Sequence, residues 1–303
     1  MSIPKFLRII RVHIVAGGFL AFSLGTLLAL VGGGSFDFVR YGLGYAAVFL
    51  GDLSTHYSND YFDVEVDKYV KQRKFFAGKN ILVDNPSLRL PSKLFSLVLL
   101  GCSNILAVVF VVFLGAPFEF FIVMLCASLV GWFYSAPPVR LVSRGFGELA
   151  VAIVTGFAIP GLGYLAIRGQ FDPMFFYFAF PFVMYGLILS LSLHAPDAEV
   201  DRRGEKLNLA VRLGQRRVFF LILTLAFSAT LTFCLYAWQG VLSIVNSYVI
   251  VLLSIVPLVA GLVGLVIFLE KKEVNSPSAL NVAALFVFNI LLNSYLLFVA
   301  SVG

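Results

Sequence analysis

The sequence predicts an all-α integral membrane protein in which nine helices cross the bilayer. Of its 303 residues, 60% are hydrophobic and only 13% are charged, and the mean hydropathy is +0.97. A soluble domain carries roughly 25% charged residues, so this chain needs lipid around it. Its apolar residues come in blocks of about 20, the length of helix that spans a hydrocarbon core. Helices are expected because backbone groups in lipid must be satisfied internally.

The apolar blocks follow one another along the chain and are separated by Gly, Pro or polar residues. Examples of such separators are "GGGS" at 32–35, "GAP" at 115–117 and "SAPP" at 135–138. The first block follows a short basic start but is long for a signal peptide and lacks a small-residue cleavage pattern, so it is interpreted as a retained helix. The expected spans are approximately 12–32, 41–59, 94–116, 118–135, 148–167, 173–195, 217–238, 241–269 and 279–302.

The Lys and Arg residues predict how these helices are oriented. With nine spans, the N-terminus and the loops after spans 2, 4, 6 and 8 share one side, and that side receives 20 of the 22 basic residues. Only Arg40 and Arg168 fall opposite. Cytoplasmic loops carry the excess of Lys and Arg, so we expect a multi-pass protein of the cell membrane with its basic side in the cytoplasm. The net charge of +6 is then explained by topology rather than by nucleic-acid binding.

Two similar acidic clusters begin the long basic loops after spans 2 and 6. "NDYFDVEVDK" occupies residues 59–68, and "DAEVDRR" occupies residues 197–203. If span 2 stays helical to its end, Asn59, Asp63 and Asp67 share one face, and Asp197 and Asp201 repeat the spacing. Asp52 and His56 extend the first face back into the membrane, and His194 precedes the second cluster by one turn.

These carboxylates are unfavourable as plain helix ends. Acidic groups at a helix C-terminus oppose the macrodipole, and like charges at i and i+4 repel. A bound cation would resolve both conflicts, and Asp and Asn oxygens are hard ligands that suit magnesium or calcium. Basic residues follow both clusters and could neutralise the outer oxygens of a diphosphate. They are Lys68, Lys71, Arg73 and Lys74 after the first cluster, and Arg202, Arg203 and Lys206 after the second.

The two clusters resemble the signatures of the UbiA superfamily of intramembrane aromatic prenyltransferases. NDxxDxxxD is matched by Asn59, Asp60, Asp63 and Asp67, and DxxxD with a following basic residue and Gly is matched by Asp197, Asp201, Arg202 and Gly204. Arg73, Gly78 and the Tyr134-Ser135 pair also look like family residues, although Lys74 stands where Pro is frequent. The resemblance covers nearly the whole chain.

The resemblance implies a fold as well as a chemistry. The fold would be one membrane-embedded domain over 1–303, with two related four-helix halves at about 1–140 and 141–273 and a last helix at about 279–302. The reaction would be Mg²⁺-dependent transfer of a prenyl group from an allylic prenyl diphosphate, through an allylic carbocation, to an electron-rich acceptor.

The same resemblance assigns roles to individual residues. Asp63, Asp67, Asp197 and Asp201 would be catalytic, and together with Asn59 and Asp60 would hold the metal. Diphosphate would be bound by Asn59, Lys68, Arg73, Tyr134 and Arg202, and the acceptor by Ser135, Glu148 and His194.

The acceptor is suggested by two further stretches. "RGFGELAV" at 144–151 and "GEKLNLAVRLG" at 204–214 look like the 1,4-dihydroxy-2-naphthoate prenyltransferases of menaquinone synthesis, although His194 and Asn208 replace the usual Asn and Thr. Other acceptors stay open: geranylgeranylglyceryl phosphate of archaeal lipid synthesis, 4-hydroxybenzoate, and chlorophyll- or haem-type precursors. A cation-coupled transporter is the alternative from another class, but it should hold its acidic residues near the midplane. Partners would be the donor, the acceptor and the bilayer, with no nucleic acid and no evident protein partner.

Overall fold

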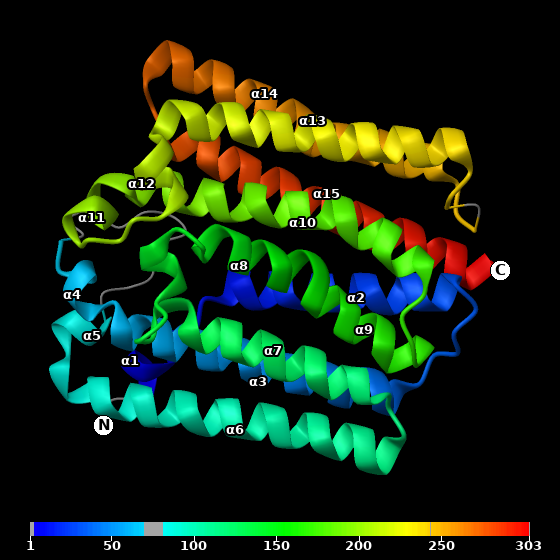
Figure 1. Ribbon diagram of the computed structural model, residues 1–303, viewed down its shortest axis with the longest axis horizontal. Coiled ribbons are helices and arrows are strands. Elements are labelled where there is room, and N and C mark those ends of the chain that lie inside the picture. Colours follow the sequence, from blue (N-terminus) through cyan, green and yellow to red (C-terminus); the bar gives the residue numbers. More distant parts are fainter. Residues whose placement is uncertain (1–2, 70–80, 243, 303) are drawn as a thin grey trace.

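The protein is a bundle of long helices that run between two ends of the molecule (Figure 1). The computed structural model describes residues 3–69, 81–242 and 244–302, and regular secondary structure in these ranges is entirely helical. The predicted all-α fold is therefore confirmed for the described residues.

Eight helical segments of the described chain are long and apolar enough to cross a membrane. Each falls on one of the spans expected from the sequence, with ends that differ by up to eight residues. They are α2 (Val12–Val31), η1 with α6 (Pro86–Leu88, Arg89–Leu114), α7 (Phe118–Ser135), α8 with η3 and α9 (Gly147–Ile153, Val154–Ala158, Ile159–Arg168), α10 with η4 and α11 (Pro173–His194, Ala195–Asp197, Ala198–Arg203), α13 (Gln215–Gln239), α14 (Ser247–Lys271) and α15 (Asn275–Val302).

Helix α3 (Phe38–Phe62) matches the remaining expected span, 41–59, but does not pass the same test of apolarity. Its 25 residues are long enough to cross, because a helix rises about 1.5 Å per residue. Polar residues that include Asp52, His56 and Asn59 lower its hydropathy. α3 packs against α2, α6, α7 and α9, so it lies within the bundle. The count of nine spans stays a prediction.

Helix ends are set by residues that the sequence supplies at the turns. Asp37 accepts hydrogen bonds from the backbone N–H groups of Val39 and Arg40 and begins α3, as expected for an N-cap. Gly240 ends α13 in the left-handed conformation, and the Asn246 side chain caps the start of α14. These two residues explain why the eighth expected span begins at Ser247 rather than at 241.

The short helices gather at one end of the bundle. α4 (Val64–Asp67), α5 (Ile81–Asp84), α11 and α12 (Leu209–Leu213) lie at the end where α14 finishes, and α15 finishes at the opposite end (Figure 1). α1 (Ile3–Leu7) also lies toward the first end. Both acidic clusters are therefore presented at the same end of the molecule.

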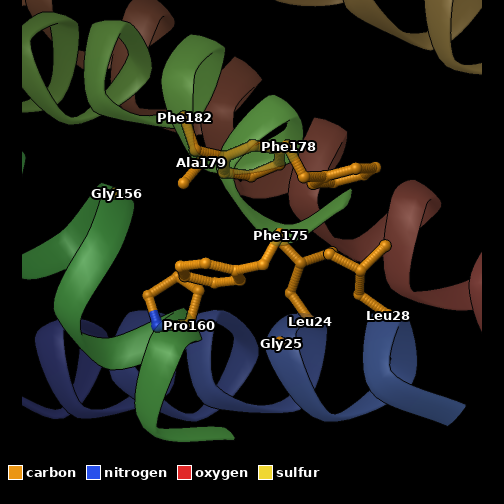
Figure 2. Close-up of a pocket in the computed structure, with 9 residues that line it drawn as sticks. All are labelled: Leu24, Gly25, Leu28, Gly156, Pro160, Phe175, Phe178, Ala179 and Phe182. Carbon is orange, nitrogen blue, oxygen red and sulfur yellow. The ribbon is translucent and has the colours of Figure 1, made fainter. Parts of the chain in front are cut away.

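Helix α2 closely approaches α9, and α10 closely approaches η3, the segment just before α9. A Cβ added at Gly25 would lie 1.8 Å from the Pro160 carbonyl oxygen, and one at Gly156 would lie 2.5 Å from the Phe182 carbonyl oxygen. Small residues permit such contacts between membrane helices. Figure 2 shows the apolar residues around this contact, which enclose a gap of about 10 Å³. A gap this small holds at most one water molecule, so it is a packing defect rather than a binding site.

Three apolar clusters form the core of the described residues, and two of them are large. The third packs α1 and α5 against α3 and α6. Of the two large clusters, one joins α10, α13, α14 and α15, and the other joins α3, α6 and α7. α2 and α9 contribute side chains to both clusters, so these two helices join the first part of the chain to the last. The predicted pseudo-repeat of two four-helix halves stays a prediction.

Candidate active site

The first acidic cluster lies at a break in a helix. α3 ends at Phe62, Asp63 has φ −92° and ψ 0°, and α4 begins at Val64. Helical hydrogen bonding continues across the break, because Asp63 N donates to the Asn59 carbonyl and Asp67 N donates to the Asp63 carbonyl, both at 2.9 Å. The expected uninterrupted helix is thus kinked, but Asn59, Asp63 and Asp67 still line one cavity.

The second acidic cluster repeats this backbone geometry. α10 ends at His194, η4 follows, and Asp197 has φ −96° and ψ 0° before α11 begins. Asp197 and Asp201 line the same cavity as the first cluster. The sequence repeat is therefore also a repeat of local structure.

Glycine allows the two clusters to pack together. A Cβ at Gly204, just after α11, would lie 2.5 Å from Cγ1 of Val66 in α4. Any other residue here would require the Val66 side chain or one of the helices to shift, so the Gly that follows the second cluster allows it to lie close to the first.

The cavity between the helices has a volume of about 450 Å³, within the range of roughly 300–1,000 Å³ for small-molecule sites. Its rim carries the acidic clusters, and apolar residues of α2, α3, α7, α8, α9, α10 and α15 form much of the remaining wall. The apolar part of the wall includes Ala21, Val48, Met124, Val151, Ile159, Leu162, Phe182, Leu189, Val282, Leu285 and Phe288. A ligand with a charged head and an apolar tail fits this distribution.

Lys206 joins the two clusters. Its backbone N–H donates to the Asp201 carbonyl at 2.8 Å, and its ammonium lies 2.8 Å from Asp63 Oδ2 with only 8% of the residue exposed. Burial alone would lower the pKa of Lys206, but the carboxylates of Asp63 and Asp201 hold that pKa above its ordinary value. The protein thus supplies a permanent cation among its own carboxylates. The sequence had placed Lys206 only among the basic residues after the second cluster.

Asp60 differs from its neighbours in the first cluster. Arg11, just before α2, donates from Nη2 to Asp60 Oδ1 at 2.7 Å, and Asp60 is 4% exposed. Asp60 does not line the cavity, whereas Arg11 does. The charge of Asp60 is thus neutralised by Arg11, which lies 49 positions earlier in the chain. No local sequence pattern indicated this pairing.

The donor atoms at the rim fit a hard divalent cation. Asn59 Oδ1 is buried and accepts no hydrogen bond from the described residues, and carboxylate oxygens of Asp63, Asp67, Asp197 and Asp201 share the cavity. Magnesium prefers oxygen ligands of this kind. In the described ranges, however, no three His, Cys, Asp or Glu side chains are already grouped as a metal cage. The ammonium of Lys206 supplies the positive charge that lies beside Asp63 in this structure.

A hydrogen-bonded chain of side chains lies beside the second cluster. Tyr134 OH is 3.0 Å from His194 Nε2, and His194 Nδ1 is 3.3 Å from Glu148 Oε1. Glu148 is fully buried and also accepts from the backbone N–H of Leu209 at 2.8 Å. Tyr134 and His194 line the cavity, whereas Glu148 lies behind them. Glu148 therefore orients His194 rather than facing a ligand in the cavity.

The remaining expected site residues are distributed differently. Ser135 Oγ donates to Asp63 Oδ2 at 3.4 Å. Lys68 is half-exposed and paired with Glu65, and the exposed Arg202 donates to the Val211 carbonyl at 3.3 Å. Neither basic residue lines the cavity. Arg73, Gly78 and Lys74 lie outside the described residues.

Asn208 is a further contact of the second cluster that sequence reasoning missed. Its Nδ2 donates to Asp201 Oδ2 at 2.7 Å while its Oδ1 caps α12 by accepting from Val211 N at 2.9 Å. An Asn before a short apolar run is an N-cap signal, which could have located this residue but not its bond to Asp201.

Comparison with known proteins identifies the family. The profile of the UbiA prenyltransferase family matches residues 19–297, whereas no curated protein sequence matches the chain. A solved structure of a UbiA homologue from Archaeoglobus fulgidus, bound to DMAPP and Mg²⁺, is similar with TM-score 0.73 and 19% identity, over 99% of this chain and 100% of that chain.

Two other solved structures share the fold. A digeranylgeranylglyceryl phosphate synthase has TM-score 0.68 and 17% identity, with 98% of each chain covered. An apo UbiA homologue from Aeropyrum pernix K1 has TM-score 0.68 and 13% identity, over 92% of this chain and 98% of that chain. The match of the family profile to most of the chain, on this shared fold, shows that the protein belongs to the UbiA prenyltransferase family and is a transferase.

Proposed function

We propose that the protein transfers a prenyl group from an allylic prenyl diphosphate to a membrane-associated acceptor in a reaction that requires Mg²⁺. The observation that carries this proposal is that both acidic clusters meet, through Lys206 and Asp63, at the rim of one cavity with largely apolar walls. Solved relatives bound to DMAPP or GPP together with Mg²⁺ support it.

The residues at the rim would bind the diphosphate head. Asn59, Asp63 and Asp67 from one cluster, and Asp197 and Asp201 from the other, would hold Mg²⁺. When bound, Mg²⁺ supplies charge stabilisation to the departing diphosphate.

Protein groups add to this stabilisation. Lys206 places a buried ammonium where negative charge develops as the carbon–oxygen bond breaks, and preorganised charges of this kind lower such barriers. Tyr134 is held by His194 beside the clusters, where its ring and hydroxyl would contact the allylic end of the donor. Lys68, Arg73 and Arg202 remain proposed as diphosphate ligands from the surrounding loops.

The apolar walls would hold the isoprenoid tail. Drawing such a tail into water would expose apolar surface at about 25 cal/mol per Å², so donor and acceptor would meet inside the cavity. Water would also be kept from the reactive carbon.

For the acceptor we infer 1,4-dihydroxy-2-naphthoate or a related aromatic quinone precursor. The two stretches that resemble that branch pack against each other: Leu207 N donates to the Ser143 carbonyl at 3.2 Å, and Arg212 Nη2 donates to the Arg144 carbonyl at 2.8 Å. Through Glu148 they orient His194 at the cavity. Ser135, Glu148 and His194 are therefore proposed to form or support part of the acceptor site. Geranylgeranylglyceryl phosphate is the second candidate, because a digeranylgeranylglyceryl phosphate synthase shares the fold.

For the topology we propose nine spans in two related halves of one domain, with the acidic clusters at the cytoplasmic face of the cell membrane. The matching backbone angles at Asp63 and Asp197 support the two halves. The 20 basic residues on one side support the orientation. Cysteine-accessibility labelling that places positions 68 and 205 on different faces would contradict it.

The function is tested with purified protein, Mg²⁺, labelled prenyl diphosphates and a panel of acceptors. We expect diphosphate release and a prenylated aromatic, and we expect the Asp63→Ala/Asp197→Ala double variant to lose Mg²⁺-dependent donor binding. Asp84→Ala, at an exposed carboxylate outside the cavity, is the matched control. Prenylation of geranylgeranylglyceryl phosphate but of no aromatic would reject the proposed acceptor. Unchanged Mg²⁺-dependent binding by the double variant would reject the proposed site.

A further inference from the structure

A second polar group lies deeper in the cavity than the acidic clusters. Asp52 and His56 of α3 both line the cavity wall, seven and three residues before Asn59. At about 1.5 Å per residue, they lie about 10 and 5 Å farther along the helix from the proposed metal site. The chain has three His residues, and His13, His56 and His194 all line this cavity. Nothing in the proposed binding of the diphosphate uses Asp52 or His56.

The hydrogen bonding of His56 is incomplete. Its Nδ1 accepts from the Arg11 backbone N–H at 3.5 Å, which places the hydrogen of the neutral ring on Nε2. Nε2 is 3.5 Å from Asp52 Oδ1 but makes no hydrogen bond with any described residue, although His56 is only 3% exposed. A buried polar group without a partner costs about 1–3 kcal/mol, so this pair is expected to serve a ligand.

The pair offers a donor and an acceptor side by side. Nε2–H of His56 can donate, and a carboxyl oxygen of Asp52 can accept. A hydroxyl group is the simplest ligand that both accepts and donates at one oxygen, so it can bridge the two side chains. An isoprenoid tail has no polar atom and cannot satisfy either of them.

Room for a ring comes from the cavity beside the pair, which α2 borders with two glycines. A Cβ at Gly18 of α2 would lie 3.8 Å from Asp52 Oδ2, and one at Gly17 would lie 3.4 Å from Cζ of Phe286. Because neither glycine has a side chain, α2 leaves the Asp52 carboxyl group accessible from the cavity. Phe286 also lines the cavity and offers an aromatic face beside this space.

We propose that Asp52 and His56 form the hydroxyl-binding end of the acceptor subsite, which takes a hydroxylated aromatic ring. This proposal rests on the proposed function and specifies which end of the cavity the acceptor occupies. One hydroxyl bridges His56 Nε2 and the Asp52 carboxyl group, and the ring extends toward the acidic clusters. A ring carbon beyond that hydroxyl then faces the allylic end of the donor. His194 and Tyr134, which line the same cavity, lie at the other end of the acceptor.

The test compares binding of 1,4-dihydroxy-2-naphthoate with that of its 1,4-dimethoxy analogue, measured by equilibrium titration of detergent-solubilised protein. Methylation removes the hydroxyl donors and leaves the ring. We expect wild type to prefer the dihydroxy compound by about 10- to 100-fold, the effect of a hydrogen bond to a charged or strongly polar group. Asp52→Leu and His56→Leu should each reduce this preference to within about threefold. Glu119→Leu, at an exposed carboxylate on α7 outside the cavity, should keep it.

Further measurements distinguish three causes of a failed result: a misfolded variant, a wrong proposed function and a wrong subsite. Binding of Mg²⁺ with geranyl diphosphate should be unchanged in Asp52→Asn, which shows that the donor site is intact. If Asp52→Asn and Asp52→Leu both bind donor normally and keep the full preference for hydroxyls, the pair holds only a water molecule or a packing contact, and the inference is overturned. If wild type binds no hydroxylated aromatic at all while it binds donor, the proposed acceptor class and this inference both fail. If wild type binds neither, the proposed function itself fails.

Discussion

Removing the ammonium of Lys206 should destabilise the protein because it leaves the mostly buried carboxylate of Asp63 without its ion-pair partner. At the observed Nζ–Oδ2 distance of 2.8 Å, two unit charges attract by about 6 kcal/mol in a medium of effective dielectric about 20. Desolvation offsets much of this attraction, and deleting one partner of a buried pair typically costs about 3–5 kcal/mol. Asp63 keeps 17% of its side chain exposed, so we expect a loss near 3 kcal/mol for Lys206→Met.

The assay is thermal unfolding of purified protein in detergent without ligands. A loss near 3 kcal/mol corresponds to a fall in Tm of about 5–10 °C for a chain of this size. Lys68→Met is the matched control, because Lys68 pairs with Glu65 at the same end of the molecule but is half-exposed. Exposed pairs contribute about 1 kcal/mol or less, so this control should melt within about 2 °C of wild type.

Added Mg²⁺ should separate the role of charge from that of packing. In Lys206→Met a divalent cation can neutralise Asp63 in place of the ammonium, so Mg²⁺ alone should raise the Tm of the variant more than that of wild type. A Lys206→Met protein that melts with wild type in the absence of Mg²⁺ would refute the buried ion pair as a source of stability.

Three further predictions concern the surroundings of this pair. Glu148→Leu removes the acceptor of the Leu209 N–H and should lower the free energy of unfolding by about 1–3 kcal/mol. Glu148→Gln keeps an acceptor oxygen and should lower it less. Thermal unfolding of both variants tests this, and equal losses of stability would contradict it. Gly204→Ala places a Cβ 2.5 Å from a methyl carbon of Val66 and should lower the free energy of unfolding by about 1–3 kcal/mol through overpacking. Val66→Ala in the same chain should recover most of this loss. A double variant whose loss equals the sum of the two single losses would argue against the contact. Burial and the nearby charge of the first cluster raise the pKa of Asp67 to about 7. Protons therefore compete with Mg²⁺ for this carboxylate, and the affinity for Mg²⁺ should fall as the pH falls below about 7. Calorimetric titration between pH 6 and 8 measures this, and an Asp67→Asn protein with the same pH dependence would count against it.

The sequence predicted those features that depend on local pattern. Apolar blocks located the eight described helices that are long and apolar enough to cross a membrane, because length and hydropathy decide what can lie in a bilayer. The acidic clusters were found from their spacing, and the structure places Asn59, Asp63, Asp67, Asp197 and Asp201 around one cavity. Their assignment as metal ligands stays a prediction.

Contacts between distant segments could not be predicted from local sequence pattern. Arg11 reaches Asp60 across 49 residues, and Lys206 reaches Asp63 across more than a hundred. Both pairs depend on how α2, α3 and α11 pack, which periodicity does not encode. Basic residues after the acidic clusters were interpreted as ligands for phosphate, whereas Lys68, Arg203 and Lys206 pair with carboxylates of the protein itself.

The polar face of α3 also bears on how the chain enters the membrane. A charged residue near the centre of a helix opposes insertion by about 2.5–3.5 kcal/mol, and Asp52 lies near the middle of α3. α3 lacks the apolarity of the other long helices, yet it packs between α2 and α6, its neighbours along the chain. We therefore expect that the polar residues that line the cavity require α3 to enter the bilayer together with α2 and α6 rather than alone.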